Sequence, residues 1–246
     1  MATRNGLGLL LALMLPAMAM ADDSGAALEV GASHKLCKGL EASIDAEVRT
    51  QDGLGDMERW SIGAALEYKF CKWLKADAGY TFIDRYIPAQ VNSKGTKRTD
   101  DYWSPRHRAF VSATGIWKPN KHWELSLRER YQYTYETKVN VPCYRLATGK
   151  RDDDKVKGDE GESLLRSRLQ VKWTIRKKCP WTPFANVEAL NDLGDGFSLD
   201  QMRYTIGTGY KINKHNSLGL SYRYKDKSNS DEAGGHLITL SYTYDF

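Results

Sequence analysis

The C-terminal eleven residues alternate strictly between apolar and polar side chains. One face of the predicted strand carries Ile238, Leu240, Tyr242, Tyr244 and Phe246. The intervening positions are Thr239, Ser241, Thr243 and Asp245. Because successive strand side chains point to opposite faces, one face meets an apolar medium and the other meets water. A terminal aromatic residue in this register is typical of the last strand of an outer-membrane β-barrel.

The same two-faced pattern recurs along the chain and predicts eleven strand segments. They cover residues 26–36, 40–49, 59–70, 74–82, 103–117, 121–136, 163–176, 181–190, 200–211, 215–226 and 235–246. Most are longer than the five or six residues usual in soluble sheets and suit strands tilted across a bilayer. The pattern therefore predicts an all-β, transmembrane antiparallel up-and-down barrel of 10–12 strands.

The number of strands is open at this stage, because bacterial single-chain barrels have even numbers. Either an additional strand lies around residues 22–30, or the segment 26–36 is assigned incorrectly. We favour twelve strands over ten.

The connections alternate between short turns and long polar loops. Short turns are predicted at residues 37–38, 71–72, 118–120, 178–180 and 213–214. Longer loops are predicted at 51–56, 87–102, 137–162, 191–199 and 227–234. In outer-membrane barrels the short turns face the periplasm and the long loops face outward. The charged run Arg151–Lys155 within the third loop predicts a solvated, mobile segment.

Glu129 interrupts the apolar face of the segment 121–136, where it shares the register of Leu127 and Tyr131. A carboxylate facing the middle of a bilayer is costly. We therefore expect a β-bulge at this position.

The N-terminus has the pattern of a secretory signal peptide. Arg4 precedes an apolar run over residues 7–15, and small residues follow at 17–21. The run is too short for a spanning helix; an N-terminal amphipathic or buried helix is the alternative. We predict a signal peptide over residues 1–21, a single barrel domain over 22–246 and export to the outer membrane, with outer-membrane lipid as a partner. The dispersed net charge of +5 does not indicate nucleic-acid binding.

Five motifs support a family resemblance. They are DMERWSIG at 56–63, WLKADAGYTF at 73–82, SPRHR at 104–108, LRERYQYT at 127–134 and MRYTIG at 202–207. Together they resemble an outer-membrane barrel family common in Bacteroidetes, domain of unknown function 2490. The resemblance implies the fold and the compartment. It implies no activity and no functional residues.

The polar face predicts a charged lumen. Its basic residues are Arg106, Arg108, Arg128, Arg130, Arg166, Arg168 and Lys172. Its acidic residues include Glu41, Asp45, Glu47, Glu67 and Asp77. One interpretation is a structural barrel plugged by arginine–carboxylate pairs, because a barrel of this size is narrow. The other is a narrow channel that selects small anionic solutes.

Catalytic motifs are missing from the sequence. Gly-x-Ser-x-Gly, a Walker loop, His-Glu-x-x-His and Cys-x-x-Cys do not occur. Ser104 and His107 are the only candidates for a nucleophile and its base, and no acidic residue is identified to complete a catalytic triad. We therefore predict no catalytic site, cofactor or metal. An outer-membrane lipid or peptide hydrolase and a soluble periplasmic lipid-binding barrel remain alternatives.

The four cysteines all lie in the predicted exported domain. Cys37, Cys71 and Cys179 fall at short turns, whereas Cys143 falls in a long loop. Because Cys37 and Cys71 are on neighbouring hairpin turns, we predict a disulfide between them. The other two are then free or paired externally.

Overall fold

The structure is a computed structural model that describes residues 24–51, 55–226 and 235–246. The predicted signal peptide and the predicted loop 227–234 lie outside the described residues. Regular structure within the described ranges is all β. No helix in those ranges is long and apolar enough to cross a membrane.

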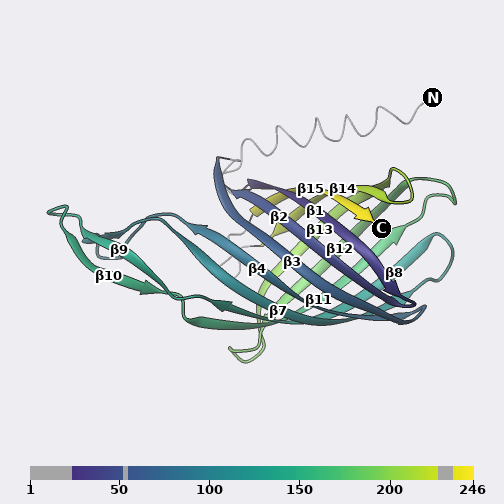
Figure 1. Cartoon of the computed structure of the whole chain (residues 1–246), viewed down its shortest axis with the longest axis horizontal. Coiled ribbons are helices and arrows are strands. Elements are labelled where there is room, and N and C mark those ends of the chain that lie inside the picture. The colour runs from purple at the N-terminus through teal and green to yellow at the C-terminus, as the bar shows by residue number, and fades with distance from the viewer. Residues whose placement is uncertain (1–23, 52–54, 227–234) are drawn as a thin grey trace.

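Eleven strands close into one barrel (Figure 1). They are β1 (Ser24–Cys37), β2 (Leu40–Gln51), β3 (Asp56–Cys71), β4 (Leu74–Ile87), β7 (Tyr102–Trp117), β8 (Trp123–Glu136), β11 (Glu160–Trp173), β12 (Trp181–Asp192), β13 (Ser198–Lys211), β14 (Asn216–Lys225) and β15 (Gly235–Asp245). Each pairs antiparallel with the next strand of the barrel. The predicted up-and-down barrel is confirmed.

The barrel closes through a parallel pair. β1 runs parallel to β15, from Ser24 opposite His236 to Ser33 opposite Asp245. Parallel closure accommodates an odd number of strands, so our preference for twelve is wrong. Residues 24–30, where an additional strand was sought, belong to β1 itself.

Short turns and long connections occupy opposite ends of the barrel. The short-turn rim carries residues 38–39, 72–73, 118–122, 174–180 and 212–215. The long-loop rim carries 88–101, 137–159 and 193–197 among the described connections. This is the predicted arrangement of periplasmic turns and extracellular loops.

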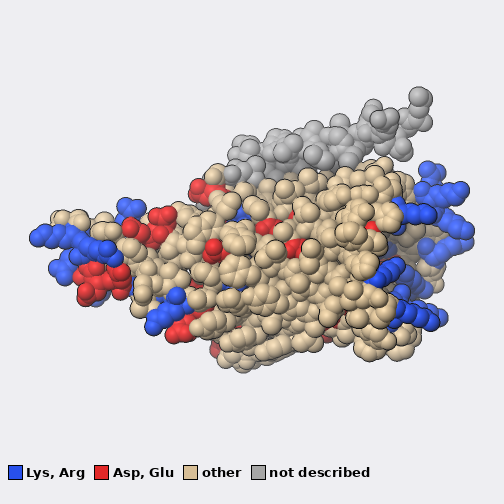
Figure 2. All heavy atoms as spheres, viewed as in Figure 1, with Lys and Arg blue, Asp and Glu red and all other residues tan. Residues whose placement is uncertain are grey.

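The outer surface is apolar, as the alternation predicts. Ile44, Ile62 and Val111 are each more than half exposed. Exposed aromatic residues follow the short-turn rim, where Trp123 and Trp173 stack with ring centroids 6.0 Å apart. Aromatic side chains along one rim of a barrel are typical of the level at which the membrane meets water. Figure 2 shows Lys and Arg gathered at the two ends of the molecule, with few on the middle of the visible face.

No bulge occurs at Glu129, contrary to our expectation. The register runs without a break through Glu129 opposite Ala113 on β7 and Ser167 on β11. The Ser167 hydroxyl donates a hydrogen bond of 2.6 Å to Glu129 Oε2. The hydroxyl of a neighbouring strand thus provides one hydrogen bond to the carboxylate, and the backbone pairing of β8 with β7 and β11 stays regular.

Two predicted loops fold into a second sheet instead. It contains β5 (Gln90–Val91), β6 (Lys97–Thr99), β9 (Val139–Arg145) and β10 (Arg151–Lys157), in the order β10-β9-β6-β5. Figure 1 shows the β9–β10 hairpin projecting beyond the barrel on the long-loop side. The charged run within 137–162 is therefore a strand and not an irregular loop, although Arg151, Asp153 and Asp154 are exposed as predicted.

Buried contacts explain why this second sheet forms. Val141 and Cys143 on β9 are at most 1% exposed. Asp152 on β10 pairs with Lys97 on β6 and with Arg145 on β9, the latter at 3.3 Å. These hydrogen bonds, chiefly that of Lys97, lower the pKa of Asp152 to about 2. The carboxylate therefore joins three strands whose own sequences are mostly polar.

Replacing Asp152 is expected to loosen the hairpin. The Asp152→Asn variant removes both ion pairs, so trypsin should cleave around Lys150 and Arg151 several-fold faster in the membrane-embedded protein. The matched control is Asp153→Asn, because Asp153 is exposed. Since the folded pKa is depressed, the contribution of Asp152 is present above pH about 4 and is lost as the pH falls toward about 2. Equal cleavage rates in the two variants would contradict the role assigned to Asp152.

Candidate functional site

The half of the lumen near the long-loop rim is filled by side chains. Its apolar part consists of Ile83, Leu164, Leu190 and Leu237, each at most 4% exposed. These residues lie on the inward, otherwise polar face of their strands, so the sequence alternation did not identify them. They replace water in the lumen with packed hydrocarbon.

Beside this cluster, a carboxylate is shared by two arginines. Glu188 on β12 accepts from Arg128 on β8 at 2.9 Å and from Arg166 on β11 at 2.8 Å. Arg166 also donates to the side-chain oxygen of Gln132 at 3.0 Å. The sequence analysis did not predict Glu188 as a lumen residue. Its alternation with the outward Val187 and Ala189 would have placed it on the lumen face.

A second buried group lies on the opposite wall. Glu47 on β2 accepts from Arg49 and from Arg59, each at 3.1 Å. The other carboxylate near Arg49 is Glu58, at 3.8 Å. We call the groups around Glu188 and Glu47 together the ionic layer; it comprises Glu47, Arg49, Glu58, Arg59, Arg128, Arg166 and Glu188. In this layer each glutamate lies within 3.8 Å of at least one arginine, so the buried carboxylates have cationic neighbours inside the barrel.

Two further arginines of the long-loop half are also engaged. Arg106 pairs with Glu136 at 2.7 Å, and Arg108 donates to the Thr134 hydroxyl at 3.0 Å. Ser104 donates to Glu136 at 2.8 Å, whereas His107 Nδ1 lies 2.5 Å from the Tyr80 hydroxyl. Ser104 and His107 thus have different partners and do not form a nucleophile–base pair.

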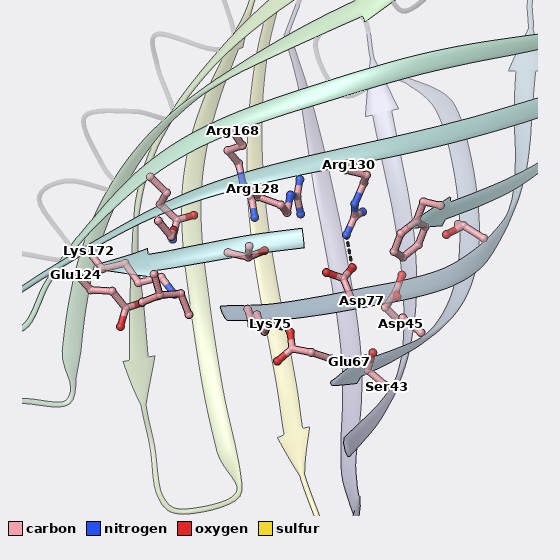
Figure 3. Close-up of a pocket in the computed structure, with 17 residues that line it drawn as sticks. Ser43, Asp45, Glu67, Lys75, Asp77, Glu124, Arg128, Arg130, Arg168 and Lys172 are labelled. Carbon is pink, nitrogen blue, oxygen red and sulfur yellow. Dashed lines mark hydrogen bonds and ion pairs between the residues drawn. The ribbon is translucent and has the colours of Figure 1, made fainter. Parts of the chain in front are cut away.

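The half of the lumen near the short turns contains a cavity of about 380 Å³, which we call the vestibule (Figure 3). Asp45, Glu67 and Asp77 line it from β2, β3 and β4. The facing wall, from β8 and β11, is lined by Arg128, Arg130, Arg168 and Lys172. The vestibule therefore has an acidic wall and a basic wall.

Most charges around the vestibule are paired. Arg130 contacts Asp77 at 2.8 Å and lies over the Phe110 ring at 3.8 Å, while the Ser112 hydroxyl donates to Asp77. Lys75 contacts Glu67 at 2.6 Å. Near the rim, Glu124 pairs with Lys118 at 2.6 Å and with Lys172 at 3.7 Å.

Three predicted lumen residues have no hydrogen bond or ion pair within the described part of the chain. They are Arg168 and Asp45, which line the vestibule on opposite sides, and Glu41. Glu41 lies opposite Glu67 in the register of β2 and β3 but is not part of the vestibule lining. Apart from Glu41, the structure thus places the predicted lumen residues in three settings: the ionic layer, the contacts of Arg106 and Arg108, and the vestibule.

The rim around the vestibule is basic. Its exposed cations are Lys35, Lys38, Lys69, Lys72, Lys118, Lys121, Arg176, Lys177, Lys178, Lys211 and Lys214. Figure 2 shows a concentration of Lys and Arg at the short-turn end of the molecule. Such a rim raises the local concentration of anions.

The cysteines are free thiols in the structure. Cys37 and Cys71 lie at the short-turn rim, as predicted, but they are not bonded to each other. Cys143 lies buried in the second sheet, and Cys179 lies in the turn before β12. The predicted Cys37–Cys71 disulfide is therefore not formed in this structure.

These features define a transmembrane β-barrel of the outer-membrane type. Residues 27–234 match the model of a protein family described as "Protein of unknown function (DUF2490)", and the chain belongs to this family. The predicted family resemblance is thereby confirmed. No curated protein matches the chain.

Solved structures with a similar fold include two autotransporter domains. The translocator domain of autotransporter NalP from Neisseria meningitidis aligns with a TM-score of 0.55 and 11% identity over 83% of this chain and 73% of that one. The beta domain of the Bordetella autotransporter BrkA aligns with a TM-score of 0.54 and 14% identity over 85% and 82% of the two chains. These similarities concern the fold.

Glu188 is expected to contribute strongly to stability. In Glu188→Gln, two buried guanidinium groups lose their shared charge partner, so we expect the free energy of unfolding to fall by about 3 kcal/mol. Thermal or urea unfolding of the detergent-solubilised barrel measures this change. The control is Glu67→Gln, whose ion pair with Lys75 is more than 30% exposed and should contribute less than about 1 kcal/mol. A smaller effect for Glu188→Gln than for the control would contradict this account.

Proposed function

We propose that this protein resides in the outer membrane as a barrel closed by its own side chains. In this proposal the vestibule admits small solutes with an anionic group from the periplasm, and no open pore continues beyond it. The apolar exterior contacts lipid, which favours a membrane location over a soluble periplasmic barrel. The aromatic residues at the short-turn rim support the same location.

The observation that carries this proposal is the sharing of Glu188 by Arg128 and Arg166. The side chains of all three residues are at most 15% exposed. They lie between the vestibule and the long-loop end, beside the apolar cluster of Leu164 and Leu190. An ion crossing the lumen has to displace paired charges and packed hydrocarbon, both of which oppose continuous conduction.

A gated, narrow channel is the second candidate. The basic wall of the vestibule and the cationic rim favour it, because both attract anions toward the closed region. In this case transport requires rearrangement of the ionic layer. No observation on the described residues favours a hydrolase, since Ser104 and His107 do not contact each other.

Planar-bilayer recordings test the closed lumen. The wild-type barrel is expected to show no continuous single-channel steps. The combined substitution Arg128→Ala, Arg166→Ala and Glu188→Ala removes three long side chains together with both ion pairs of Glu188, and discrete steps should appear. The matched control is Lys75→Ala with Glu67→Ala, which removes an ion pair of the vestibule and should stay silent.

Steady conductance of the wild-type protein would contradict the closed barrel and support an open pore. Folding of each variant is checked by the difference in migration between heated and unheated samples in detergent gels.

A further inference from the structure

The vestibule presents one unpaired charge on each of its two walls. Arg168 on β11 and Asp45 on β2 both line it, and neither makes a hydrogen bond or ion pair within the described ranges. Figure 3 shows the two side chains on opposite sides of the cavity. The charged groups between them, Arg130 and Asp77, are already joined to each other at 2.8 Å.

Arg168 has no hydrogen bond or ion pair within the described residues, although a carboxylate lies beside it, because both oxygens of that carboxylate already accept from other arginines. Arg168 lies opposite Glu188 in the β11–β12 register, but Arg128 occupies Oε1 of Glu188 and Arg166 occupies Oε2. On its other side Arg168 lies opposite Arg128, a like charge. The guanidinium group therefore faces the cavity with both neighbouring charged groups already engaged with each other, which leaves it able to bind an added anion.

Asp45 is in the complementary situation. Arg49 and Arg59, the arginines nearest in sequence on its wall, are bound to Glu47. The Asp45 carboxylate lies over Gly63, where a Cβ atom would stand 2.8 Å from Oδ1. The glycine thus leaves the room that this carboxylate occupies at the cavity wall, where it favours an added cation.

From these two groups we infer that the vestibule binds a small zwitterion, such as an amino acid or a short peptide. The carboxylate of the solute lies against Arg168, and its ammonium group lies against Asp45. Ser43, Ser126 and Gln170 also line the cavity and offer neutral hydrogen-bonding groups to the peptide units. This inference rests on the proposed function, because a closed lumen retains the solute in the vestibule.

The size and setting of the cavity suit such a solute. Its volume of about 380 Å³ falls within the range of about 300–1,000 Å³ that is usual for small-molecule sites. A zwitterion supplies opposite charges to both unpaired groups at once, whereas a simple anion leaves Asp45 unpaired. Lysines at the rim attract the carboxylate end of the incoming solute.

Isothermal titration calorimetry with three matched peptides tests the inference on the purified full barrel in detergent. Triglycine carries both charges, N-acetyl-triglycine carries only the carboxylate, and triglycine amide carries only the ammonium group. We expect triglycine to bind about tenfold more tightly than either blocked peptide, because each lost contact is a hydrogen bond to a charged group.

Two variants give a crossed pattern that a general loss of folding does not reproduce. Arg168→Gln should weaken binding of triglycine and N-acetyl-triglycine about tenfold and leave triglycine amide unchanged. Asp45→Asn should weaken triglycine and triglycine amide and leave N-acetyl-triglycine unchanged. The matched controls are Arg98→Gln and Asp153→Asn, exposed residues of the second sheet, and both should bind all three peptides as the wild type does.

Each contrary result overturns the zwitterion site. Equal binding of triglycine and N-acetyl-triglycine, unaffected by Asp45→Asn, identifies a simple anion site instead. Equal binding of triglycine and triglycine amide, unaffected by Arg168→Gln, identifies a cation site. Absence of binding by all three peptides to the wild type also rejects the inference. The closed lumen is judged separately by bilayer conductance, so failure of the zwitterion site can be distinguished from failure of the proposed function.

Discussion

The parallel pairing of β1 with β15 is the constraint on which the rest of the barrel depends. Inside a bilayer every backbone amide and carbonyl has to be paired within the protein, so an open sheet edge is not tolerated. Ten register pairs from Ser24 to Ser33 close this seam. At the short-turn end, the Phe246 amide donates to the Ser33 carbonyl at 2.9 Å, and the Ser33 hydroxyl donates to Asp245 at 2.8 Å. The C-terminus is thereby fixed against the first strand.

Closure with eleven strands sets the width of the lumen. This width determines whether inward side chains from different strands can contact one another. A barrel of this size is narrow enough for long side chains to reach one another across it. Near the long-loop rim, arginine–carboxylate pairs and four apolar side chains fill the interior. Toward the short turns, the same geometry leaves the vestibule. The difference between the halves comes from which side chains are inward, since the backbone ladder continues through both.

The sequence predicted the strands well because lipid imposes a strict period of two on the outer face. The lumen has no comparable uniform solvent, so its contents were predicted only in part. Leu164 and Leu190 occupy positions where alternation predicts polar residues, and only the three-dimensional structure shows that they are buried. Glu188 follows the alternation, but its two arginine partners come from other strands and are not evident from spacing.

The second sheet and the strand number were mispredicted for a related reason. β9 and β10 are stabilised by contacts with β6, a segment about 40 residues earlier in the chain. The charged composition of β10 is typical of a solvent-exposed loop. The buried apolar residues of the hairpin, Val141 and Cys143, are too few to give a clear apolar pattern. Likewise, the parity of the strand count depends on how the first and last strands meet, which is a non-local property.

The register also explains why unpaired charges remain in the vestibule. Glu41, Glu67 and Asp77 form a row across β2, β3 and β4, while Arg128 and Arg168 lie opposite each other on β8 and β11. Like charges opposite each other repel, and Asp77 and Arg128 have their partners beyond the adjacent strand. Arg130 reaches past β7 to Asp77, and Arg128 reaches past β11 to Glu188. These longer connections brace the barrel across its cross-section. Arg168 and Asp45 remain on opposite sides of the cavity, with no hydrogen bond or ion pair within the described part of the chain.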